Sequence, residues 1–118
     1  MAEVPPVVRY LIVCDDIVVN PARPRRVTLI GLSGGYRSKL DPPFPYRHPE
    51  FCVFVQLTEC RGAGAARLEI VRADSGQTVS RTPDRTVDFG DDPLEVHGIR
   101  YRVRNCLFPS EGLYWVQF

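Results

Sequence analysis

The sequence lacks several features that would assign a protein to a class at once. Only one of its 15 basic residues is a lysine, only two residues are histidines, and the formal net charge is +1. No apolar run approaches the ~18 residues that a membrane-spanning helix needs. The first residues show neither the basic nor the apolar segment of a secretory signal peptide. We therefore expect a cytoplasmic protein with no membrane contact and no strongly charged partner.

Motifs of catalysis and of metal or nucleotide binding are also absent. There is no Gly-x-Ser-x-Gly, no Gly-x-x-x-x-Gly-Lys and no His-Glu-x-x-His. The four cysteines, Cys14, Cys52, Cys60 and Cys106, do not form the Cys-x-x-Cys spacing that structural zinc favours. In a reducing compartment they are expected to be free thiols, mostly buried. We predict no catalytic residue, no cofactor, no bound metal and no small-molecule ligand.

A small enzyme or metal-binding domain that uses cysteine, histidine and aspartate stays open as an alternative. The fold could bring such side chains together without a local motif; the candidates are His48, His97, Cys52, Cys106, Asp15 and Asp16. Acidic residues that meet at one end of the fold could also bind calcium; these are Asp15, Asp16, Asp41, Asp91 and Asp92. The simpler expectation is a structural role, in which these carboxylates pair with arginines or accept hydrogen bonds from backbone amides.

Short β-branched and aromatic segments between proline- and glycine-rich turns predict an all-β fold. The chain has 11 prolines and 9 glycines, and no ten-residue segment shows helical periodicity. Strands are expected at 7–20, 27–32, 51–57, 67–72, 77–81, 86–89, 96–104 and 114–118, with a loose loop at 61–64. The stretch 40–50 has four prolines and is expected to be irregular, outside any central strand.

Three local patterns make sharper predictions. The alternation in 51–57 places four apolar side chains on one face: Phe51, Val53, Val55 and Leu57. Asp15 and Asp16 interrupt an apolar strand and predict a bend or bulge, and Gly98 predicts another bulge. Tyr114 follows a Pro-to-Gly loop and, as in immunoglobulin-like sandwiches, its hydroxyl is expected to bond back to the backbone a few residues upstream.

These elements predict a single domain over residues 1–118, with 1–6 as a flexible N-terminal lead. Its expected architecture is an immunoglobulin-like antiparallel β-sandwich of about seven to eight strands.

Three blocks carry a resemblance to a known group: residues 10–16 (YLIVCDD), 41–45 with 52–57 (DPPFP, CVFVQL), and 104–109 with 112–115 (RNCLFP, GLYW). They resemble an uncharacterised family of small bacterial immunoglobulin-like β-sandwich domains without assigned activity. The resemblance implies the sandwich fold and supplies no catalytic residues. Such domains continue into a hairpin and one more strand, whereas this sequence ends at Phe118, which leaves the closure of one sheet open.

Two surfaces are candidates for function. Arginines at every second position of one strand, Arg100, Arg102 and Arg104, form a basic face. This face suggests, as an alternative function, weak binding of nucleic acid. Because the net charge is only +1, we expect instead that the three arginines pair with acidic residues on a neighbouring strand.

The last strand is the second candidate. Its residues, Leu113, Tyr114, Trp115, Val116, Gln117 and Phe118, include no lysine, no proline and no charge. An edge strand without such protection invites pairing with another chain. We therefore predict a non-catalytic binding or assembly module that acts through a sheet edge or face, with a protein partner or, most simply, as a homodimer. Pairing of this strand with 7–20 inside the domain is the competing account.

Overall fold

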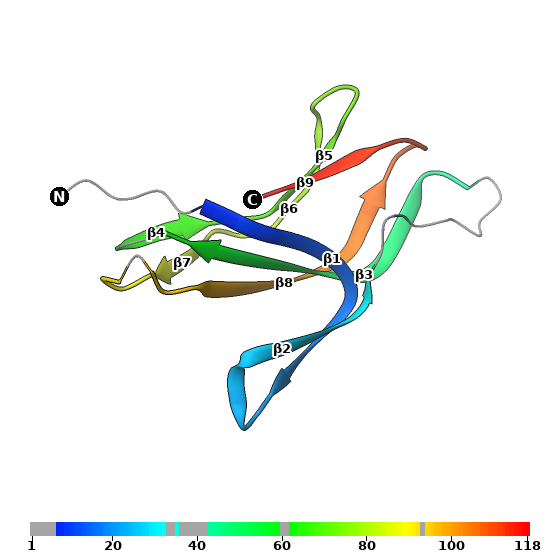
Figure 1. Ribbon diagram of the computed structural model, residues 1–118. Coiled ribbons are helices and arrows are strands. Elements are labelled where there is room, and N and C mark those ends of the chain that lie inside the picture. Colours follow the sequence, from blue (N-terminus) through cyan, green and yellow to red (C-terminus); the bar gives the residue numbers. More distant parts are fainter. Residues whose placement is uncertain (1–6, 33–34, 36–42, 60–61, 93) are drawn as a thin grey trace.

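The computed structural model describes residues 7–32, 35, 43–59, 62–92 and 94–118 (Figure 1). Within these residues the chain forms nine strands and no helix: β1 (Val7–Asn20), β2 (Arg23–Leu32), β3 (Tyr46–Thr58), β4 (Ala63–Ala66), β5 (Glu69–Arg72), β6 (Thr78–Arg81), β7 (Arg85–Asp88), β8 (His97–Phe108) and β9 (Tyr114–Gln117). The predicted all-β class is confirmed. The structure has one strand more than the eight that were predicted: β4 begins inside the loop expected at 61–64. The N-terminal lead predicted at 1–6 lies outside the described residues.

The strands form three antiparallel sheets, with the orders β2-β1-β3-β8, β4-β7 and β6-β5-β9. β1 pairs with β3 as far as Cys14 and with β2 from Cys14 onward. Figure 1 shows that β1 curves strongly, so that its second half and β2 project as a two-stranded ribbon. The curvature accommodates the change of partner.

The core lies on one face of the four-stranded sheet, against side chains of the smaller sheets. Every second residue of β3 from Phe51 to Leu57 is buried, as predicted. The cluster comprises Phe51, Val53, Val55, Leu57, Leu68, Ile70, Phe89, Ile99, Tyr101, Val103 and Cys106. Because β3 and β8 present apolar side chains at opposed positions of this face, they contribute most of the cluster.

The expectation that 40–50 contains no part of a central strand is wrong for its second half. β3 begins at Tyr46, and β3 lies between β1 and β8. However, β3 pairs with β1 only as far as Cys52, so Pro49 has a strand neighbour on one side only. A proline, which has no amide hydrogen, is tolerated at such an edge-like position.

No bulge is found at either predicted position, but the other form of the first prediction, a bend at Asp15 and Asp16, agrees with the curvature of β1 just after it changes partner at Cys14. The β1–β2 register is regular through Asp16, and β1 is irregular at Val8/Tyr10 and Val19/Asn20 instead. Gly98 pairs in regular register with Gln56. A Cβ at Gly98 would lie 3.0 Å from the Phe54 ring, so this glycine makes room for an aromatic side chain.

Candidate functional site

β9 forms one edge of the β6-β5-β9 sheet. It pairs along its four residues with β5, from Arg72↔Tyr114 to Glu69↔Gln117. The competing prediction, that this strand pairs with residues 7–20, is therefore wrong: its partner inside the domain is β5. The other edge of β9 has no strand neighbour among the described residues.

Aromatic contacts and one hydrogen bond hold the start of β9 in place. The Tyr114 hydroxyl donates to the Ser110 carbonyl at 2.7 Å, which confirms the predicted bond to the upstream backbone. The Tyr114 ring meets the Phe108 ring edge-on, with 4.9 Å between centroids. At the other end, Phe118 contacts Tyr101 of the core, with centroids 6.3 Å apart. The strand is thus fixed at both ends while one edge stays open.

Apolar side chains around β9 remain exposed. Leu113 is 63% exposed and Trp115 is 52% exposed. Tyr114 and Val116, which alternate with them, point toward the core. Because successive strand residues face opposite sides, β9 packs Tyr114 and Val116 against the core and leaves Trp115 exposed on its other face.

An apolar cavity of about 260 Å³ lies beside β9. Its lining includes the aromatic residues Phe44, Tyr46, Phe51, Phe108 and Tyr114, together with aliphatic residues such as Val116. The Ser110 hydroxyl, also in the lining, is buried without a hydrogen-bond partner in the described part of the chain. Sequence reasoning missed this cavity because its walls come from segments far apart in the chain.

The projecting β1–β2 ribbon is a second exposed apolar region that sequence reasoning missed. Val18 and Ile30 are each 47% exposed, and Leu32 is 70% exposed. The alternation of the ribbon is visible in the sequence, but only the curvature of β1 takes it away from the core.

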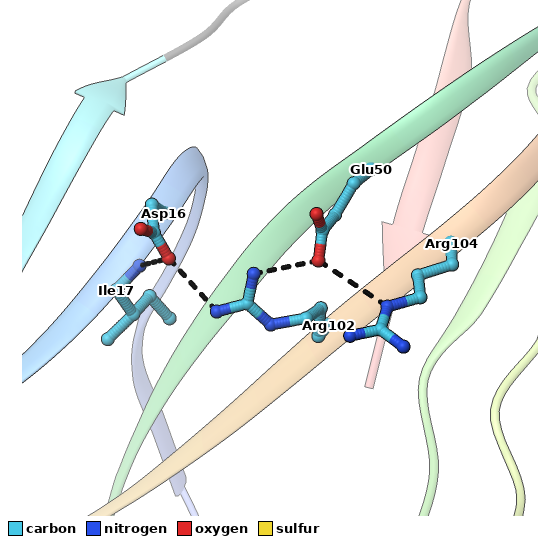
Figure 2. Close-up of polar contacts among 5 residues, drawn as sticks. All are labelled: Asp16, Ile17, Glu50, Arg102 and Arg104. Carbon is cyan, nitrogen blue, oxygen red and sulfur yellow. Dashed lines mark hydrogen bonds and ion pairs between the residues drawn. The ribbon is translucent and has the colours of Figure 1, made fainter.

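The three arginines of the basic face lie on β8, and two of them are paired with carboxylates (Figure 2). Arg102 donates to Glu50 of β3 at 2.7 Å and to Asp16 of β1 at 2.9 Å. The Arg104 Nε lies 3.5 Å from the same Glu50 carboxylate. The Arg100 side chain forms no ion pair with the described residues. The expected pairing with acidic residues is therefore found for Arg102 and Arg104. Their partners lie on the neighbouring strand β3 and, for Arg102, also on β1 beyond it.

This network shifts the pKa of its members. The hydrogen bonds from Arg102 hold the pKa of both Asp16 and Glu50 below their ordinary values. The pKa of Arg102 rises in turn, chiefly through its bonds to Glu50 and Asp16. Asp16, Glu50 and Arg102 are therefore all charged at neutral pH. The basic face predicted from the sequence thus carries negative carboxylates beside its positive arginines.

The thiols that were expected to be buried are buried wherever the structure describes them. Cys14, Cys52 and Cys106 are free, and each is at most 1% exposed. Burial raises the pKa of all three. Cys60 lies outside the described residues. Cys14 and Cys52 face each other across β1 and β3.

The two histidines lie in different surroundings. The Tyr46 hydroxyl and the His48 Nδ1 are 2.9 Å apart. The His97 ring contacts Phe89 edge-on at 5.3 Å, and its Nε2 is buried without a partner in the described part of the chain. Among residues 7–32, 35, 43–59, 62–92 and 94–118, no group of three or more His, Cys, Asp or Glu could hold a metal ion. Asp41 of the calcium alternative lies outside these residues.

Comparison with known proteins adds no relative. No protein-family model matches the chain, and searches of curated proteins and of solved structures find no significant match. Of the structural features that the resemblance implied, the described residues show the antiparallel all-β fold. They contain no helix long and apolar enough to cross a membrane.

Proposed function

We propose that the protein is a non-catalytic, cytoplasmic binding or assembly module of immunoglobulin-like sandwich type. In this proposal the open edge of β9 pairs with a strand of another chain, most simply with β9 of a second copy. One observation carries the proposal: β9 is held firmly on one side by β5 and has no strand neighbour on the other among the described residues. Such an edge presents unpaired amide and carbonyl groups.

The chemistry around the edge supports strand pairing. Leu113, Trp115 and Phe118 are exposed, and no charged side chain lies between 113 and 118. An antiparallel β9–β9 pair has two-fold symmetry, so the same residues meet from both chains. Each exposed Trp115 then comes close to the other copy, which removes apolar surface from water. Because β9 is short, this contact is weaker than a permanent dimer interface.

Light scattering coupled to size-exclusion chromatography tests this proposal. At concentrations from about 5 to about 500 μM, we expect the mass to rise from monomer toward dimer, as the law of mass action requires. The substitution Leu113→Lys places a charge beside the open edge and should keep the protein monomeric. Leu94→Lys is the matched control, because Leu94 is 83% exposed and lies outside β9.

Two outcomes would overturn the β9–β9 homodimer, which is the simplest form of the proposal. A monomer at every concentration would exclude the homodimer. A dimer that persists in Leu113→Lys but is lost in Ile30→Lys would assign the contact to the β1–β2 ribbon. A circular dichroism spectrum equal to that of the unmodified protein shows that a variant is folded, so that its change in mass reflects association alone.

A further inference from the structure

Cys14 and Cys52 form an opposed thiol pair outside the main core. They are register partners in β1 and β3. Neither belongs to the buried cluster between the sheets, whereas Cys106 does. Opposed residues of an antiparallel pair lie on the same face with Cβ atoms about 4.5–5.5 Å apart. A disulfide needs about 3.5–4.5 Å, so a small approach of the two strands suffices.

The Arg102 network lies at the same place on this face. Arg102 of β8 is the register partner of Cys52, so Cys14, Cys52 and Arg102 form one row across three strands. The carboxylates that bind Arg102 come from Asp16 and Glu50, each two residues from one of the thiols. Figure 2 shows Arg102 extended between these carboxylates. Both thiols are at most 1% exposed, whereas Arg102 is exposed in the same row and its charge acts on the Cys52 thiol; the Arg102 network is therefore the candidate cover of the pair.

We infer that Cys14 and Cys52 are a redox-sensitive dithiol that closes to a disulfide across β1 and β3, with Arg102 limiting access to it. The oxidant is a low-molecular-weight disulfide. The thiolate of one cysteine attacks a sulfur of the oxidant, forms a mixed disulfide and releases one small thiol. The second thiolate attacks the protein sulfur of the mixed disulfide and releases the other small thiol. Two electrons pass to the oxidant, and the two cysteine protons end on the released thiols.

The surroundings set the rate of this reaction. Burial raises the pKa of both thiols, so the reactive thiolate is scarce at neutral pH and more abundant at higher pH. The charged groups that act on Cys52 are Arg102, which favours the thiolate, and Asp16 and Glu50, which oppose it. Opening of the cover exposes the pair to the oxidant.

Oxidised glutathione is the probe for the first test. Reduced protein is incubated with it at pH 8, quenched with acid, alkylated and digested with trypsin and Glu-C, which separates Cys52 from Cys60 at Glu59. Mass spectrometry should find Cys14 joined to Cys52, and reduction should restore both thiols. Cys14→Ala should leave glutathione on Cys52. Persistence of both thiols, or a disulfide that uses Cys60 or Cys106 instead, would overturn the inference.

The second test concerns the cover. Arg102→Ala should speed disulfide formation about two- to fivefold, the range expected for loss of an exposed ion pair that restrains local opening. Arg100→Ala is the matched control, since Arg100 lies two residues away on the same strand and forms no ion pair with the described residues. Equal rates for both variants and the unmodified protein would refute the role of Arg102. A melting temperature for each variant identifies any rate change caused by general destabilisation.

Discussion

The Tyr114→Phe substitution removes the hydroxyl that ties the start of β9 to the loop before it. The lost interaction is a hydrogen bond of 2.7 Å to the Ser110 carbonyl. The contact of the ring with Phe108 is kept, so no cavity forms. A hydrogen bond of this kind contributes about 0.5–1.5 kcal/mol to stability. For a chain of this length, we expect a decrease of roughly 4 °C in melting temperature per kcal/mol.

The same chemical change at two other positions provides the controls. Tyr10 is 51% exposed, and its hydroxyl bonds to no described residue; Tyr10→Phe should change stability by less than about 0.5 kcal/mol. Tyr101 is 4% exposed, and its hydroxyl is buried without a partner in the described part of the chain. Tyr101→Phe should therefore leave stability unchanged or raise it by up to about 1 kcal/mol.

Thermal unfolding followed by circular dichroism, with urea unfolding as a second measure, gives all three values. The expected order of stability is Tyr101→Phe, then Tyr10→Phe, then Tyr114→Phe. If Tyr114→Phe were as stable as Tyr10→Phe, the bond to Ser110 would contribute nothing. If Tyr101→Phe lost more than about 1 kcal/mol, the Tyr101 hydroxyl would have a partner, and the reasoning about its burial would be refuted.

Two further measurements test the sheet that carries the arginines. Gly98→Ala should destabilise the protein by about 1–3 kcal/mol in urea unfolding, because the new Cβ would press on the Phe54 ring; a gain in stability would show that the ring moves freely. Arg102 lowers the pKa of Asp16 and of Glu50. Their ion pairs therefore stabilise the folded protein fully above the ordinary carboxyl pKa of about 4. This stabilisation is lost as the pH falls through the lowered pKa values. Urea midpoints between pH 7 and 3 should therefore fall less steeply in Arg102→Ala, and parallel curves would contradict the assigned cause.

Features that depend on neighbours along the chain were predicted from the sequence. The alternation from Phe51 to Leu57 identified a buried face, because successive residues of any strand point to opposite sides. The loop before Tyr114 identified the hydroxyl bond to the backbone, which spans only four residues. In both cases local backbone geometry determines where the side chain points, whatever the rest of the fold does.

Features that depend on pairing between distant segments needed the tertiary structure. The pairing of β9 with β5, and not with 7–20, joins segments that lie far apart in the chain. The opposition of Cys14 and Cys52 depends on the register between β1 and β3, and a shift of one residue would turn one of them to the other face. Arg102 reaches Asp16 only because β3 brings β1 and β8 within one side-chain length. The sequence by itself indicated most of the strands and the buried face of β3. Packing between segments far apart in the chain decided which strands became neighbours and in what register.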